Sequence, residues 1–215
     1  MSVPLHLEVL DPAALVALKE HAGAAHAEGF YLAGGTALAL QLGHRRSVDF
    51  DWFRGAEFDA LALAQRLADH GVAFLSRSTA RGTLHGTVGG TRVSFLEFRY
   101  PLLEGTVAAT LGSGQGFQLA GLRDIGTMKL AAVTQRGARK DFFDLVALGR
   151  AGLRLDALLA AYQERFGVRD SGHVLTARTY FDDAERDTEP ILGAREDWAS
   201  VKAAIRGWVR ALAGS

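Results

Sequence analysis

The sequence predicts an α+β fold, with a small mixed β-sheet flanked by helices followed by an all-helical C-terminal half. Short apolar segments of strand type alternate with helical segments up to about residue 105. From Leu122 onward, only helical periodicity is present. We therefore expect a mixed-sheet core over residues 1–110 and a helical region over residues 111–215 that packs on the core.

Each expected element has local signals in the sequence. Asp11 is suited to cap the first helix, with Pro12 in the first helical position, and Gly89-Gly90 is suited to a tight hairpin turn. The expected elements of the first half are helices 11–28, 37–42 and 59–70 and strands 30–33, 48–53, 72–77, 83–88 and 92–98. The second half is expected to hold helices that begin near Leu122 and Lys140, and helices 155–165, 171–184 and 198–212.

Composition excludes several classes of protein. The 24 basic and 24 acidic side chains balance, so the chain lacks the bulk positive charge of many nucleic-acid-binding proteins, and any RNA contact should be a local patch. The absence of cysteine excludes disulfides and thiolate metal sites. The sequence contains no apolar run of about 18 or more residues, so it predicts no membrane span. Residues 1–10 do not resemble a signal peptide. We expect a cytoplasmic protein.

The most informative stretch joins Gly34-Gly35-Thr36 to the acidic pair Asp49 and Asp51. If 48–53 is a strand, the two carboxylates share one face. Such a pair is stabilised by a cation, and Mg²⁺ takes one or two carboxylates and completes its shell with phosphate oxygens. The glycines allow close backbone approach, and the following helix offers N–H groups to an anion. The stretch therefore predicts a site for Mg²⁺, or Mn²⁺, and a triphosphate.

Three further residues of the first half are candidates for the same site. Arg45 and Ser47 precede the acidic strand and are candidates for contact with the phosphates. Glu97 shares a face of its strand with Val93 and Phe95, and is a candidate third carboxylate beside Asp49 and Asp51. The alternative for Glu97 is a solvated acid at a strand end. The glycine-rich loop 112–116 lacks the Lys-Ser/Thr of a phosphate-binding loop, so we interpret it as a turn.

The Gly-Gly and Asp-x-Asp pattern resembles the signature of the polymerase-beta-like nucleotidyltransferases. The fuller string over residues 33–51 is more specifically similar to the AbiEii/AbiGii nucleotidyltransferase toxins of type IV toxin-antitoxin and abortive-infection systems. A second cluster, Lys129, Arg136-Gly137 and residues 140–145 (Lys-Asp-Phe-Phe-Asp-Leu), also resembles that family. Together the resemblance covers about residues 30 to 200.

The resemblance implies roles for two residues of the helical half. It implies that Lys129 and Asp141 approach the catalytic cleft, where an ammonium would stabilise the departing pyrophosphate. The alternatives are a surface lysine on an amphipathic helix and an acid that stabilises a helix N-terminus. Lys140 and Asp144, four residues apart, are expected to form a surface ion pair.

The resemblance also implies an activity and partners. The chain would be a metal-dependent enzyme that transfers a nucleoside monophosphate from an NTP to an acceptor hydroxyl, with the tRNA 3′ end or another RNA as acceptor and a separately encoded antitoxin. One alternative is a nucleotidyltransferase that modifies a protein, as in AMPylation. The others are a non-catalytic module that binds nucleotide or antitoxin, and a metal-dependent phosphohydrolase.

Overall fold

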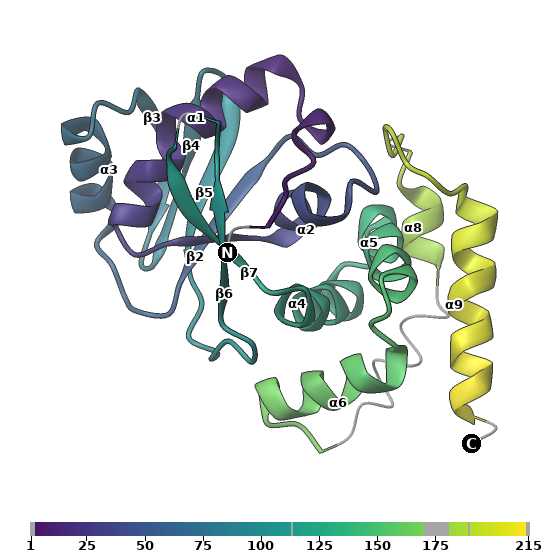
Figure 1. Ribbon diagram of the computed structural model, residues 1–215. Helices are drawn as coiled ribbons and strands as arrows, with labels where there is room; N and C mark the ends of the chain where they lie inside the picture. The colour runs from purple at the N-terminus through teal and green to yellow at the C-terminus, as the bar shows by residue number, and fades with distance from the viewer. Residues whose placement is uncertain (1–2, 113, 170–180, 189, 214–215) are drawn as a thin grey trace. The chain divides into compact units, whose positions relative to one another are not determined.

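The computed structural model describes residues 3–112, 114–169, 181–188 and 190–213. The chain divides into two compact units, residues 1–121 and residues 122–215. The first unit contains the whole sheet and the second is helical (Figure 1). This confirms the α+β class, a mixed sheet followed by a helical C-terminal half.

The first unit is a seven-stranded mixed sheet with helices. The strand order is β3-β4-β5-β2-β1-β7-β6, in which β2 runs parallel to β5, β1 runs parallel to β7, and the other neighbours are antiparallel. Its elements are the 3-10 helix Leu7–Val9, α1 (Pro12–Ala27), β1 (Tyr31–Ala33), α2 (Gly34–Leu42), β2 (Phe50–Arg54), α3 (Ala60–Asp69), β3 (Phe74–Ala80), β4 (Thr83–Val88), β5 (Thr91–Glu97), β6 (Thr106–Thr110) and β7 (Gly116–Ala120).

The expected local signals operate at the ends of these elements. Asp11 caps α1 by accepting a hydrogen bond from the backbone N–H of Ala14, at 2.7 Å. The turn between β4 and β5 uses Gly89 and Gly90, both with positive φ (55° and 82°), which is the geometry that a two-residue hairpin turn requires.

The boundary between the halves is corrected by the structure. We expected the core to end at residue 110, but β7 pairs with β6 and with β1, and the first unit extends to Gly121. The predicted turn at 112–116 joins these two strands, with the N–H of Leu111 donating to the carbonyl oxygen of Gln115. The strands were missed because β6 consists of small residues with little contrast between its faces.

The sheet has one apolar and one polar face where β2, β5 and β4 adjoin. The apolar face consists of fully buried side chains, among them Phe50, Trp52, Leu84, Val93 and Phe95. The polar face consists of Asp51, His85, Thr87, Arg92 and Ser94, which alternate with them along the strands. The strong contrast between the faces fixes the register, since a slip of one residue would bury the polar set.

Helix α1 packs on the apolar face through a hydrogen bond between buried aromatic side chains. His21 is fully buried, and its Nε2 accepts from the indole N–H of Trp52 at 2.9 Å. Its Nδ1–H donates to the carbonyl oxygen of Ala17 at 2.5 Å. Both ring nitrogens are therefore satisfied only when the imidazole is neutral.

We expect the first unit to lose stability as pH falls through the range in which His21 is titrated. Burial lowers the pKa of His21 from 6.5 to about 4. The imidazole of His21 binds a proton more readily in the unfolded chain than in the folded one. The stability that neutral His21 contributes is therefore fully present above about pH 6.5 and is lost as pH falls toward 4. The total loss is about 3 kcal/mol. Denaturant unfolding of the wild type and of His21→Gln across this pH range measures it. The variant should show the smaller pH dependence; equal slopes would contradict the assignment.

The second unit is built from helices around aromatic side chains. Its elements are α4 (Leu122–Gln135), α5 (Arg139–Arg150), α6 (Leu155–Phe166), α8 (Asp182–Arg186) and α9 (Trp198–Ala213). Phe142 and Phe143 of α5 contact Trp198 at the start of α9, with ring centroids 5.8 and 6.0 Å apart. Most of the expected helix 171–184 lies outside the described residues, and α8 covers its end.

Candidate active site

The Gly-Gly-Thr stretch forms the junction between β1 and α2. β1 ends at Ala33 and α2 begins at Gly34, so the backbone N–H groups of its first turn have no partner within the helix and can bind an anion. Asp51 is paired with Ala33 in the antiparallel β1–β2 ladder, which places it beside this junction. A Cβ built on Gly34 would lie 3.3 Å from Oδ2 of Asp51. The glycine turn and one carboxylate of the acidic pair therefore form one site.

Gly34 is required here for two reasons, which a pair of variants separates. Its φ is +68°, and its missing side chain leaves room for Asp51. Gly34→Ala should destabilise the first unit by about 1–2 kcal/mol and also displace the Asp51 carboxylate. Gly71 has φ +80° with nothing within 4 Å, so Gly71→Ala introduces the strain alone. Denaturant unfolding should show similar destabilisation in the two variants. Activity assays, at temperatures where both variants are folded, should show a loss only in Gly34→Ala. Equal activities would contradict a role for the close approach.

Asp49 immediately precedes β2, and hydroxyl groups fix its backbone. The hydroxyl of buried Thr36 donates to the carbonyl oxygen of Asp49. Because that bond uses the only proton of the Thr36 hydroxyl, the Ser47 hydroxyl donates to Thr36 Oγ1, at 2.7 Å. α2 is thus tied to the segment that carries the first acid. The Thr36 side chain is committed to this link, and binding of phosphate by its backbone N–H stays a prediction.

The Asp49 carboxylate forms a bidentate ion pair with Arg92 of β5. Nε donates to Oδ1 and Nη2 donates to Oδ2, both at 2.8 Å. The Phe50–Val93 pairing of the parallel β2–β5 ladder brings the preceding residues, Asp49 and Arg92, level with each other. Asp49 is one-third exposed and Arg92 three-quarters exposed, so the pair is accessible to solvent.

The donor set formed by Asp49 and Asp51 fits a cation that is held together with phosphate. Two carboxylates supply hard oxygen ligands but do not complete a coordination shell. Among the described residues, no group of three or more His, Cys, Asp or Glu side chains is arranged to hold a metal ion. Mg²⁺ usually keeps part of its shell for water and substrate phosphates, so binding of Mg²⁺ by Asp49 and Asp51 stays a prediction.

Glu97 does not lie beside the acidic pair, and that expectation was wrong. The β2–β5 register pairs Asp51 with Ser94 and Glu97 with Arg54. Glu97 is thus three residues further along β5 and on the opposite face of the sheet from Asp51. Its carboxylate forms an ion pair with Arg99.

The residues that do lie beside Asp51 were not singled out in the sequence. Ser94 is its neighbour on β5, and His85 is the neighbour of Ser94 on β4. Oγ of Ser94 and Nδ1 of His85 are 3.0 Å apart. Strand alternation predicts that Ser94 faces away from Val93 and Phe95, but only the register between strands places it next to Asp51.

The loop that enters the acidic segment is buried at His44 and Arg45 and exposed at Arg46 and Val48. Arg45 is buried, and its Nη1 donates to the carbonyl oxygen of Arg46 at 2.8 Å. The backbone N–H of Ser47 donates to the carbonyl oxygen of Val9 at 3.2 Å. A contact from Arg45 or Ser47 to phosphate stays a prediction.

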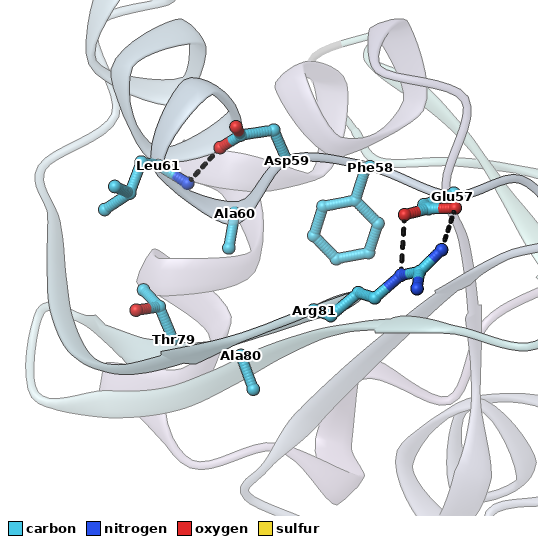
Figure 2. A pocket seen from close by; sticks show the side chains of 8 residues that line it. All are labelled: Glu57, Phe58, Asp59, Ala60, Leu61, Thr79, Ala80 and Arg81. Carbon is cyan, nitrogen blue, oxygen red and sulfur yellow. Dashed lines mark hydrogen bonds and ion pairs between the residues drawn. The ribbon is translucent and has the colours of Figure 1, made fainter.

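A separate pocket of about 450 Å³ opens at the start of α3 (Figure 2). It is lined by residues 57–61 and 79–81. Glu57 and Arg81 form a bidentate ion pair at 2.8 and 2.9 Å, and Asp59 accepts from the backbone N–H of Leu61 at 2.8 Å. Its described charged groups thus bind one another or cap a helix, and neither Asp49 nor Asp51 lines it.

In the second unit, Lys129 of α4 and the acids of α5 form a buried ionic cluster. The ammonium lies 2.9 Å from Oδ1 of Asp141 and 2.5 Å from Oδ2 of Asp144, and both carboxylates are fully buried. Arg136 donates to both oxygens of Asp141, at 2.9 and 3.1 Å. Burial raises the pKa of Asp141, but Lys129 and Arg136 outweigh it, so that pKa lies below its ordinary value.

The cluster corrects the sequence-based interpretation of α5. Asp144 does not form the expected surface ion pair with Lys140; it is fully buried against Lys129. Lys129 is only 4% exposed, so it is not a surface lysine on an amphipathic helix. The two predicted site residues of this unit, Lys129 and Asp141, are in direct contact.

The fold of this chain is that of nucleotidyltransferases, as two solved structures show. A crystal structure of a candidate nucleotidyltransferase from H. pylori aligns with a TM-score of 0.59 and 16% identity, covering 94% of this chain and 95% of that one. MenT4, a nucleotidyltransferase toxin from Mycobacterium tuberculosis H37Rv, aligns with a TM-score of 0.55 and 18% identity, covering 93% and 86%.

The chain belongs to the AbiEii nucleotidyltransferase toxin family of type IV toxin-antitoxin systems, whose family model matches residues 16–112 and 112–208. An uncharacterized protein of Aquifex aeolicus (strain VF5) is 38% identical over 162 residues, which are 74% of this chain and 76% of that protein. The resemblance seen in the two sequence clusters is thereby confirmed. No described helix is long and apolar enough to cross a bilayer.

Proposed function

We propose that this protein transfers a nucleoside monophosphate from an NTP to an acceptor hydroxyl, with Mg²⁺ or Mn²⁺ held by Asp49 and Asp51. The observation that carries the proposal is the pairing of Asp51 with Ala33, which places a carboxylate against the anion-binding start of α2. Metal-binding oxygens and phosphate-binding N–H groups thus adjoin. When bound, the metal would align the acceptor hydroxyl with the α-phosphorus and neutralise charge on the departing pyrophosphate.

The residues of the first unit have distinct tasks in this proposal. The N–H groups at Gly34, Gly35 and Thr36 bind triphosphate oxygens, since they have no helical partners. The hydroxyl chain from Ser47 through Thr36 holds the backbone of Asp49 and so orients its carboxylate. Arg45 and Ser47 are proposed to stand near the phosphates.

We propose that the cluster of the second unit positions Lys129. Lys129 carries the ammonium that would oppose the charge of the pyrophosphate, and Asp141 and Asp144 hold it in one orientation. That the helical unit completes the active site stays a prediction.

RNA is the acceptor class we propose, with the tRNA 3′ end first among candidates. Membership of a toxin family of type IV systems supports two parts of this proposal: modification of a cellular target stops growth, and the chain has a cognate antitoxin. A tRNA acceptor would place the reaction in the cytoplasm. The balanced net charge means that a local surface, not bulk charge, must hold the RNA.

Labelling tests the proposal directly. The purified protein is incubated with Mg²⁺, each α-labelled NTP in turn, and either total RNA or protein lysate. Label on RNA from one or more NTPs is the expected result, and its position is read by 3′-end sequencing. Label on protein would indicate an AMPylation-type enzyme, and release of free nucleotide without labelled acceptor would indicate a phosphohydrolase. Absence of any reaction would overturn the proposed activity.

A further inference from the structure

We propose that Arg92 couples metal binding to triphosphate binding, because it competes with metal for Asp49 and binds the triphosphate once it is displaced. This inference rests on the proposed function and concerns the order in which the same site is filled. It starts from the bidentate pair, in which the guanidinium binds both carboxylate oxygens of Asp49 at 2.8 Å. A metal ion that binds Asp49 must therefore share or displace a cation already in place.

The geometry of the pair makes displacement feasible. Arg92 is 74% exposed and Asp49 32% exposed. Solvent-exposed ion pairs contribute about 0.2–1 kcal/mol, far less than buried ones. The pair therefore weakens metal binding by a small factor and does not block it.

A triphosphate gives the displaced guanidinium a new partner. Arg92 lies on the polar face next to Asp49, and Ser94, two residues along the strand, lies next to Asp51. Thr36 of α2 bonds to the backbone of Asp49, whose carboxylate binds Arg92, so phosphate groups at the start of α2 would be near the Arg92 side chain. Because guanidinium forks bind phosphate as well as carboxylate, the change of partner keeps the charge paired.

The consequence is a coupling between the two ligands. Metal alone would break the Arg92–Asp49 pair, whereas metal that arrives with triphosphate also brings phosphate oxygens for the guanidinium to bind. Arg92 thus lowers the affinity for metal alone and raises the affinity for the metal–triphosphate complex. Such opposite contributions favour occupancy of the site by the complete substrate.

Two binding measurements on the whole chain test this without reference to turnover. Free Mn²⁺, quantified by electron paramagnetic resonance, gives the affinity for metal alone. Calorimetry with the preformed complex of Mn²⁺ and inorganic tripolyphosphate gives the affinity for the complex. In Arg92→Gln we expect Mn²⁺ alone to bind about twofold to fivefold more tightly and the complex about fivefold to tenfold more weakly.

The chain offers a matched control. Arg81 forms the same bidentate arrangement with Glu57, at 2.8 and 2.9 Å, and is similarly exposed at 77%. Arg81→Gln removes an equal charge from the same unit and should change neither affinity by more than about 1.5-fold, the effect of a screened distant charge. Arg92→Lys keeps the charge but loses the fork, and should fall between the wild type and Arg92→Gln in both measurements.

The outcomes separate this inference from the proposed function. Opposite shifts in Arg92→Gln support the coupling, and shifts in the same direction or no shift overturn it. Asp49→Asn serves as the test of the site itself. If Asp49→Asn binds Mn²⁺ and its tripolyphosphate complex as the wild type does, the metal site at Asp49, and with it the proposed function, is refuted.

Discussion

Asp51→Asn is expected to lower the rate of nucleotidyl transfer by about 10³-fold, and Asp49→Asn is expected to lower it by slightly less. The Asp51 carboxylate lies against Gly34 at the start of α2, so it can hold a cation that also binds phosphate. A bound cation stabilises transition-state charge by several kcal/mol, and each 1.4 kcal/mol corresponds to a tenfold change in rate. Initial rates with the labelled NTP and RNA acceptor measure the loss, and circular dichroism confirms folding.

Glu97→Gln is the matched control for these variants. It removes a carboxylate from a neighbouring strand, but the register places that carboxylate on the opposite face of the sheet. Its rate should stay within about threefold of the wild type, because the substitution lies away from the acidic pair. If Glu97→Gln were as inactive as Asp51→Asn, or if Asp51→Asn kept wild-type activity, the site would be wrongly placed.

The largest effect on stability is expected from Lys129→Met. The ammonium lies between the buried carboxylates of Asp141 and Asp144, so its removal leaves buried negative charge without its partner. Breaking a buried ion pair from one side costs about 3–5 kcal/mol. Denaturant unfolding, followed by a signal from the second unit such as Trp198 fluorescence, measures the change.

A second substitution tests whether buried charge causes the loss. In Lys129→Met/Asp144→Leu a carboxylate that the ammonium binds at 2.5 Å is also removed, whereas Asp141 keeps Arg136. The double variant should regain most of the lost stability, because apolar replacement of a buried pair is often neutral. Arg154→Gln, which breaks an exposed pair with Asp156, should cost less than about 1 kcal/mol. A single variant as stable as the wild type would contradict the buried cluster.

Signals from residues adjacent in the chain were enough to predict most elements of the fold. Asp11, Pro12 and the Gly89-Gly90 turn act through short-range backbone geometry, so the sequence alone reveals them. The joining of the Gly-Gly-Thr turn to Asp51 was also predictable, because a strand, a turn and a second strand are close in the chain. β6 and β7 were missed because Ala108 and Ala109 give a weak alternation signal.

Two predictions failed because they depended on relations between distant segments. Alternation along one strand says which residues share a face, but not which residue of the next strand lies level with them. Glu97 was therefore misplaced, and Ser94 and His85 were overlooked. Likewise, the four-residue spacing of Lys140 and Asp144 suggested a surface pair, whereas packing of α4 against α5 supplies Lys129 as the partner.

A crystal structure with Mn²⁺ and an α,β-methylene nucleoside triphosphate would test the central claim most directly. The account predicts an anomalous peak bound by the carboxylates of Asp49 and Asp51, with phosphate oxygens on the N–H groups of Gly34 to Thr36. A metal peak remote from both carboxylates, or a triphosphate away from the start of α2, would contradict it.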